Sequence, residues 1–321
     1  MSTPRKHHYL PQFYLEAFKI FPQKGKKPHI WQIEKEGEQK HYSPAVEDTG
    51  CIRDFHTIDH NEQEPDHKII ESMLSQIEGK QAELVQLIIA TKEVSNSQII
   101  ELSEFISLMR YRIPAFAAHV EASHKAEVLD AFKIMYKSGK LGEPPIALKN
   151  EFESKGIDEA INIEISNWKI VEQMFKVALS NENISLLSQL NYQVFYSKEP
   201  DAFISSDNPV ALYHQNYNLL KPYGVGLGIK GVELTIPLSH DTFLKAGHHL
   251  KPGTFVASSE QVNEFNRRTI IMGESYIFSN NAHSELRSMI NELKGQFAGF
   301  KFDNLFHGDG SVHISRFIPV Q

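Results

Sequence analysis

The chain has 321 residues, of which 41% are hydrophobic and 23% charged, as in an ordinary folded globular protein. Its formal net charge of −7 counts against a long nucleic-acid footprint, because phosphate contacts are made mainly by basic side chains. Cys51 is the only cysteine, which excludes an internal disulfide and a cysteine-rich zinc module.

Residues 1–66 are the first of three subregions. They begin with a dense motif, His7-His8-Tyr9-Leu10-Pro11-Gln12-Phe13-Tyr14-Leu15, in which we expect His7 to be solvated. Pro11 predicts the start of a short helix over residues 12–19, with apolar side chains that anchor the N-terminus in the core. Residues 29–33 alternate like a strand, and Glu36-Gly37-Glu38 is the turn of a predicted hairpin.

Residues 67–189 follow a helical period. Apolar side chains recur at three- and four-residue steps between residues 69 and 88, and a second helix begins near Ser97. Pro114 is expected to break or kink it. The helical pattern resumes over residues 115–137 and again over about 158–181. No apolar run approaches the roughly 20 residues that span a bilayer, so we expect a cytoplasmic protein without a membrane partner.

Residues 190–321 are β-rich. A helix is predicted near residues 261–272 and a hairpin over 300–317; the predicted strands are 192–196, 202–205, 209–213, 232–236, 242–246 and 275–278. The chain is therefore expected to form a single integrated α+β domain, residues 1–321, in which a helical layer (roughly residues 66–181) packs on a mostly antiparallel C-terminal sheet.

The tetrapeptide Ser206-Asp207-Asn208-Pro209 is the most pointed local signal, because it lies between two strand candidates. Asp and Ser side chains readily cap a turn, and the residue before proline favours an extended backbone. A structural turn is the preferred interpretation. The alternative is a carboxylate, Asp207, presented beside a functional site.

Glu71 and Glu78 are seven residues apart, which places them on one face of the predicted helix, at the edge of its apolar stripe. They either reach a partly buried polar site, such as a metal ion or a buried arginine, or are solvated charges. Arg110 and Arg112 lie in an apolar helix, where an unpaired arginine is costly to bury. Either they extend to the surface, or one of them pairs with a carboxylate such as Glu71, Glu78 or Asp207. A contact with a phosphate or carboxylate ligand is the third alternative.

Three further groups are weaker signals. Asn263 and Asn266 share one face of the late helix, as surface residues or substrate contacts. Asp54-Phe55-His56 and Asp59-His60 carry side chains that can bind metal, but without a recognised ligand spacing. The glycine-rich segment 224–231 lacks the spacing of a phosphate loop and leads into a strand pattern, so we expect a mobile loop.

One set of motifs runs in order along nearly the whole chain: residues 8–15, Asp54-Phe55, Glu71, Glu78, and residues 112–114, 203–210, 237–239 and 262–266. With this set the chain resembles a bacterial family, domain of unknown function 4238. The family often has Tyr where this chain has His56, and Thr where it has Ile113. The resemblance implies a bacterial protein with one integrated domain, and it implies no activity. The family pattern keeps polar residues that we expect to converge on one pocket: His8, Gln12, Glu71, Glu78, Arg112, Asp207 and Asn208.

One predicted function is a metal-assisted hydrolase of phosphodiester bonds in a nucleic acid or nucleotide, acting in bacterial defence. In this prediction Asp207, Glu71 and Arg112 are catalytic, and Arg112 neutralises a phosphate. A divalent metal is held by His8, Glu71, Glu78 and Asp207, while Gln12, Asn208, Asn263 and Asn266 contact the substrate.

The alternative function is a binding or sensing module, or a subunit of a complex, in which the same polar side chains form a buried structural network. A protein partner is then expected at residues 213–231, where tyrosines surround the glycine-rich segment. A single cavity lined by the candidate residues favours the enzyme. A sealed Arg112 and an Asp207 that caps its own turn favour the alternative.

Overall fold

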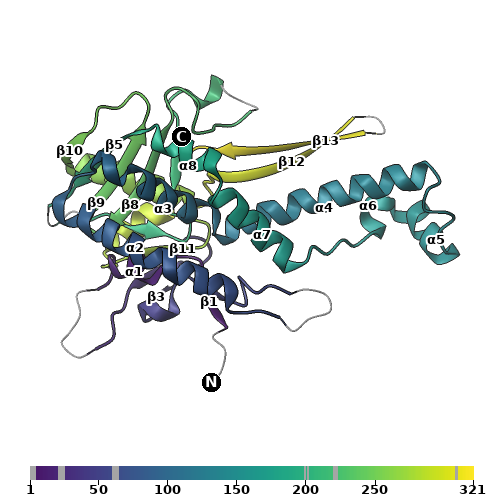
Figure 1. The fold of residues 1–321 in the computed structure, drawn as a ribbon, viewed down its shortest axis with the longest axis horizontal. Coiled ribbons are helices and arrows are strands. Elements are labelled where there is room, and N and C mark those ends of the chain that lie inside the picture. The colour runs from purple at the N-terminus through teal and green to yellow at the C-terminus, as the bar shows by residue number, and fades with distance from the viewer. Residues whose placement is uncertain are drawn as a thin grey trace.

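Helices fill the middle of the chain in the computed structural model, which describes residues 5–20, 26–59, 65–198, 200, 202–219, 223–307 and 310–321. The helices in this part of the chain are α2 (Ile69–Thr91), α3 (Ile99–Tyr111), α4 (Pro114–Lys137), α5 (Ile146–Lys155), α6 (Ile157–Ala160), α7 (Asn167–Ala178) and α8 (Asn181–Ser188). Helix α2 contacts both α3 and β8 (Glu233–Ser239), a strand of the main sheet. Figure 1 shows α2 and α3 as a layer in front of that sheet.

The main sheet has five strands in the order β10-β5-β9-β8-β7. All neighbours are antiparallel except β10 and β5, which are parallel. Strand β8 is almost wholly buried because α2 and α9 both contact it. The bounds are β5 (Asn191–Tyr196), β7 (Ala211–Tyr213), β8 (Glu233–Ser239), β9 (Thr242–Gly247), β10 (Gly253–Val256) and α9 (Ser259–Met272). The protein is thus α+β, with a helical layer on a mostly antiparallel sheet.

A second sheet joins strands from the N-terminal and C-terminal parts of the chain, in the order β3-β2-β11-β6. The predicted N-terminal hairpin is confirmed, since β2 and β3 pair antiparallel with Gln32 opposite Tyr42. Strand β11 lies between β2 and β6, so it ties the N-terminal hairpin to the Ser206-Asp207 segment. The bounds are β2 (Trp31–Glu34), β3 (His41–Tyr42), β6 (Ser205–Ser206) and β11 (Tyr276–Ser279).

The N-terminal motif is folded into the core. Strand β1 (Lys6–His8) pairs antiparallel with β4 (Cys51–Arg53), and Pro11 precedes the short helix α1 (Gln12–Glu16). The backbone oxygen of Gly50 accepts a hydrogen bond from the amide of Tyr9 at 2.9 Å. Gly50 has φ +63°, and a Cβ there would lie 2.9 Å from Leu15 Cδ1, so this close approach requires glycine.

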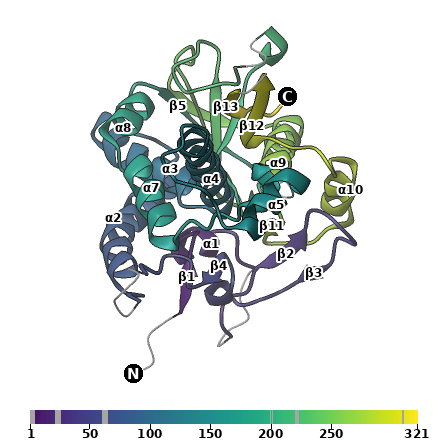
Figure 2. The ribbon, with the colours of Figure 1, turned by 90° about the vertical axis from the view of Figure 1, so that its right-hand side faces the viewer.

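A helical arm projects from the body of the molecule (Figures 1 and 2). It consists of α4 with α5 and α6 near its outer end, and the hairpin of β12 (Gly299–His307) and β13 (Gly310–Ile318) contacts α4. Pro114 breaks the helical pattern as predicted, since α3 ends at Tyr111 and Pro114 is the first residue of α4. The remaining elements are α10 (Ser284–Glu292) and the 3₁₀ helices η1 (Val46–Asp48), η2 (Asn96–Gln98) and η3 (Tyr217–Leu219).

The single helix predicted over residues 158–181 is wrong, because the segment divides into α6, α7 and the start of α8. Residues 161–166, Ile-Asn-Ile-Glu-Ile-Ser, are not helical. Their isoleucines alternate with polar residues, a pattern that favours an extended backbone. Ser166 has the extended φ and ψ of a helix N-cap, and α7 begins after it. Sequence reasoning also missed β1, β4, α5, β10 and α10.

Candidate functional site

A cavity of about 390 Å³ opens between the N-terminal segment and α2. Glu71 and Glu78 face it together because seven residues make two turns of a helix. From the N-terminal segment, β1 contributes His8 and α1 contributes Gln12. We call this cavity the cleft, and its lining residues are His8, Gln12, Phe13, Glu71, Leu74, Ser75, Glu78, Gly79 and Ala82.

His8 reaches the cleft because side chains alternate along β1, so that it points away from its neighbour His7. Its Nε2 lies 3.2 Å from the backbone oxygen of Glu47 and 3.4 Å from Nε2 of Gln12. A carbonyl oxygen only accepts, so Nε2 carries the proton and Nδ1 keeps its lone pair. Burial lowers the pKa of His8, although the contact with Glu47 opposes this. The neutral ring can therefore offer Nδ1 to a cation.

Glu71 is held from behind by His56, whose Nδ1 lies 2.8 Å from Glu71 Oε1. The His56 side chain is completely buried, and burial lowers its pKa to about 4. The neutral ring therefore donates its Nδ1 proton to the carboxylate. Burial acts to raise the pKa of Glu71, but the hydrogen bond from His56 and the charge of Arg112 outweigh it and hold that pKa below its usual value. Glu71 is thus ionised at neutral pH.

Glu78 forms an ion pair with Arg112, with Nη1 2.7 Å from Glu78 Oε1. The arginine is fully enclosed. Its Nε donates to the backbone oxygen of Tyr9 at 2.9 Å, and its Nη2 to that of His8 at 3.4 Å. Arg112 therefore ties the N-terminal motif to α2, and its guanidinium is not among the groups that line the cleft.

Glu71 and Glu78 each keep a second carboxylate oxygen that is available to a ligand in the cleft. Within the described ranges, Oε2 of Glu71 and Oε2 of Glu78 form no hydrogen bond or ion pair. Glu71 and Glu78 are 30% and 24% exposed, so solvent reaches both side chains. Each carboxylate is fixed by one oxygen and free at the other, so each keeps one oxygen that could serve as a ligand for a cation.

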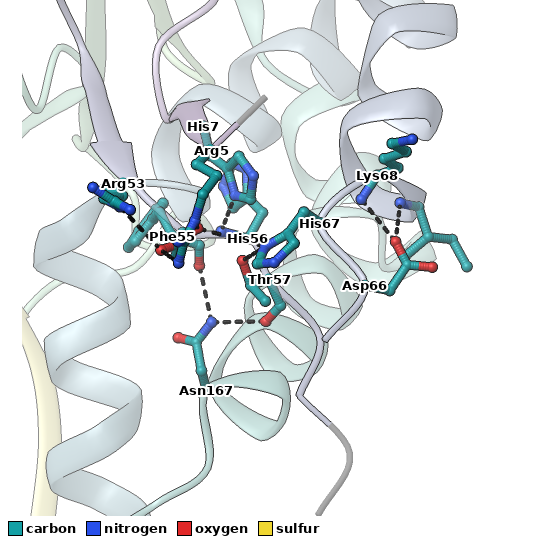
Figure 3. Close-up of polar contacts among 12 residues, drawn as sticks. Arg5, His7, Arg53, Phe55, His56, Thr57, Asp66, His67, Lys68 and Asn167 are labelled. Carbon is teal, nitrogen blue, oxygen red and sulfur yellow. Dashed lines mark hydrogen bonds and ion pairs between the residues drawn. The ribbon is translucent and has the colours of Figure 1, made fainter. Parts of the chain in front are cut away.

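His7 is completely buried, so the expectation that it is solvated is wrong. It faces the core because it is the central residue of β1, and its ring stacks on His56 with centroids 5.8 Å apart. Figure 3 shows both rings near His67. Nδ1 of His67 lies 2.8 Å from Oγ1 of Thr57, within hydrogen-bond distance. Nε2 of His7 and Nε2 of His56 have no partner among the described residues.

His7, His56 and Glu71 form a group that could hold a metal, because a ring nitrogen of each histidine and a carboxylate oxygen lie within 4.8 Å of one another. The hydrogen bonds argue against His7 as a ligand. Its Nδ1 accepts the backbone N–H of His56 at 2.8 Å, so the proton of the neutral ring is on Nε2. A metal-bound histidine needs its proton on the nitrogen that does not bind the metal. His56 has the opposite arrangement and leaves Nε2 with a lone pair.

Asp207 does not line the cleft. Its Oδ1 accepts the backbone N–H of Glu274 at 2.8 Å, and its Oδ2 accepts those of Ser275 at 2.8 Å and Tyr276 at 3.1 Å. The residue is 7% exposed. Burial raises the pKa of Asp207, although the three amides favour the charged form. The carboxylate holds the chain between α9 and β11, as in the structural interpretation of this tetrapeptide.

The asparagines also lie outside the cleft. Asn208 is buried, and neither polar atom of its side chain has a partner among the described residues. Asn263 and Asn266 line a separate cavity of about 560 Å³ between α9 and α10. Both polar atoms of the Asn266 side chain already have partners. Its Oδ1 accepts the backbone N–H of Ile204 at 3.1 Å, and its Nδ2 donates to the backbone oxygen of Ala202 at 2.9 Å.

Sequence reasoning missed the two buried histidines that stand behind the cleft. The signal for His7 was the alternation expected of a three-residue strand, in which one of two adjacent histidines must face inward. The signal for His56 was its place in a loop already noted for side chains that can bind metal. In the same loop, His60 lies outside the described residues.

The proposed partner surface, residues 213–231, is only partly described, since residues 220–222 lie outside the described ranges. Tyr223 is 85% exposed, whereas Tyr217 is buried. The glycine-rich segment contacts the C-terminal hairpin, where the amide of Val225 donates to the oxygen of Phe317 at 2.9 Å. Among the described residues, none of the helices combines the length and the apolar character needed to cross a membrane.

Comparison with known proteins places the chain in one family. No curated protein and no solved structure matches it. A family model described as protein of unknown function (DUF4238) matches residues 6–283, a span that includes the cleft, the Asp207 turn and α9. The chain therefore belongs to the DUF4238 family.

Proposed function

We propose that the cleft is the active site of a metal-assisted hydrolase of phosphodiester bonds in a nucleic acid or nucleotide. The observation that carries the proposal is the pair Glu71 and Glu78, each fixed by one oxygen and free at the other, in one cavity. Together with Nδ1 of His8 they offer the donors that Mg²⁺ or Mn²⁺ accepts.

The charge of the cleft supports a cation as an essential component. Its lining includes two carboxylates and neither lysine nor arginine, so an anionic substrate would be repelled without a bound metal. A divalent cation would neutralise that charge, polarise the phosphoryl oxygen and lower the pKa of a bound water. In this proposal Gln12 donates to the substrate, and Arg112 acts on Glu78 rather than on a phosphate.

The proposal extends to a bacterial cytoplasmic enzyme that acts in defence against foreign nucleic acid. This extension rests on the bacterial setting of the family resemblance. Asp207, Asn208, Asn263 and Asn266 have no role in it, because they line other parts of the molecule.

The test measures Mn²⁺ binding by calorimetry and hydrolysis of bis(p-nitrophenyl) phosphate, single-stranded DNA, RNA and nucleotides. We expect Glu71→Gln and Glu78→Gln to lose cation binding and turnover. Glu83→Gln is the matched control, since Glu83 is an exposed glutamate on the same helix. Turnover that survives both cleft substitutions would overturn the proposed site.

A second candidate function is a binding or sensing module, or a subunit of a complex. It is favoured by the enclosure of Arg112, whose contacts among the described residues tie the N-terminal motif to Glu78 of α2. Buried polar networks can specify a packing without any reaction. Cation binding without turnover on any of these substrates would favour this function. The exposed Tyr223 is then the first residue to substitute when a protein partner is sought.

A further inference from the structure

A serine and a histidine meet at the base of the projecting arm, far along the chain from the cleft residues. Nε2 of His119 on α4 lies 2.7 Å from Oγ of Ser315 on β13. This is within the reach expected of a nucleophile and its base. Ser315 is exposed, and the pair opens into a cavity of about 250 Å³.

Aromatic rings fix the orientation of the His119 imidazole. Phe116 stacks on it with ring centroids 6.1 Å apart, Phe300 lies at 5.4 Å, and Phe302 meets it edge-on at 6.2 Å. Burial lowers the pKa of His119, so the ring is neutral at pH 7 and able to accept a proton. Its Nδ1 is buried and has no partner among the described residues. The aromatic rings therefore take the orienting role that a carboxylate has in a triad.

We propose that Ser315 and His119 form a nucleophile and base pair that hydrolyses small, uncharged carboxylic esters by acyl transfer. Oγ of Ser315 bonds to the ester carbonyl carbon while its proton passes to Nε2 of His119. The carbon–oxygen bond to the alcohol then breaks, and the alcohol leaves with that proton. Water attacks the acyl-serine, His119 takes and returns one proton, and a carboxylic acid and free Ser315 result.

The walls of the cavity define the substrate class. Phe116 and Val120 give it an apolar side that suits a short acyl chain. Gln173 on α7 lines the same cavity and is the amide donor available to the carbonyl oxygen. Glu127 also lines it, and no lysine or arginine does, which disfavours an anionic substrate. This activity does not rest on the proposed function of the cleft, with which the cavity shares no residue.

The test uses the full chain with a fluorophosphonate probe, followed by peptide mass spectrometry, and measures turnover of p-nitrophenyl acetate. We expect the probe to label Ser315. Ser315→Ala should abolish that labelling and the ester turnover, and His119→Gln should slow labelling by about 100-fold or more. Ser288→Ala, at an exposed serine of α10, is the control and should leave both unchanged.

Three results would overturn the proposal: an unlabelled Ser315, ester turnover that persists in Ser315→Ala, or equal labelling in folded His119→Gln. Because Ser315 is exposed, its alanine variant is expected to fold. The test therefore stands on Ser315→Ala even if His119→Gln is unstable, and circular dichroism of each variant establishes which of them fold.

Discussion

The cleft and the Asp207 turn use carboxylates in opposite ways. In the cleft, Glu71 and Glu78 each contact one buried side chain and keep a second oxygen open to solvent. At the turn, both oxygens of Asp207 accept backbone N–H groups, and the residue is almost fully enclosed. A carboxylate that is fixed and still open can bind a ligand, whereas one with every oxygen satisfied by the backbone stabilises the fold.

The largest expected effect on stability comes from Arg112, the buried partner of Glu78 behind the cleft. Arg112→Met should lower the free energy of unfolding by about 3–5 kcal/mol, because it leaves Glu78 without its partner and the buried carbonyl of Tyr9 without this donor. Urea denaturation measures this. Arg110→Met is the matched control: that buried arginine faces aromatic rings, with Phe317 at 4.2 Å, and we expect a cost of about 1 kcal/mol. Equal costs for the two variants would contradict the assigned role of Arg112.

Asp207→Asn should cost about 2–3 kcal/mol, because one carboxylate oxygen becomes an amide nitrogen that faces backbone N–H groups. Mn²⁺ binding by the folded variant should equal that of the wild type. The comparison between the two regions fails if Asp207→Asn loses cation binding while its stability is unchanged.

The histidine behind the cleft should make stability depend on pH. The pKa of His56 falls from an ordinary 6.5 to about 4 on folding, so below pH 6.5 the unfolded chain binds a proton that the folded chain does not. The free energy of unfolding should therefore decrease as the pH falls from 6.5 towards 4, by up to about 1.4 kcal/mol per pH unit. The measurement is urea denaturation at several pH values, with His56→Gln as the comparison. Parallel curves for the two proteins between pH 6.5 and 4.5 would contradict the buried, neutral His56.

Local spacing was sufficient to predict part of the candidate site. Two helical turns separate Glu71 from Glu78, and both line one cavity as that spacing implies. The cost of burying an unpaired arginine made an ion pair with a carboxylate one of the alternatives for Arg112, and the structure has that pair, with Glu78. The first feature depends on helix periodicity, and the second on the electrostatic cost of burying an unpaired charge.

The rest depends on contacts between distant segments. Asp207 turns inward because the backbone amides of residues 274–276 lie beside it, and their position follows from the pairing of β11 with β6. Which of His7 and His8 faces the core follows from the pairing of β1 with β4. Strand order and register of this kind have no signature within a single segment of sequence. The α+β class and most elements could be predicted from local patterns. The division near residues 161–166 also had a local signal, the alternation of isoleucine with polar residues, which the prediction of a single helix did not use.

The smallest expected effect belongs to a side chain that faces the cleft without supporting the fold. Gln12 is exposed, and among the described residues its side chain has one polar contact, the 3.4 Å approach to Nε2 of His8. Gln12→Ala should therefore change the free energy of unfolding by no more than about 0.5 kcal/mol. Because the proposed metal ligands remain, Mn²⁺ affinity should fall far less than in Glu71→Gln, and any loss should appear in binding of the proposed substrate. A stability loss above about 1.5 kcal/mol would mean that the side chains facing the cleft also belong to the structural network. The difference between the cleft and the Asp207 turn would then disappear, and the binding module would be favoured over the hydrolase.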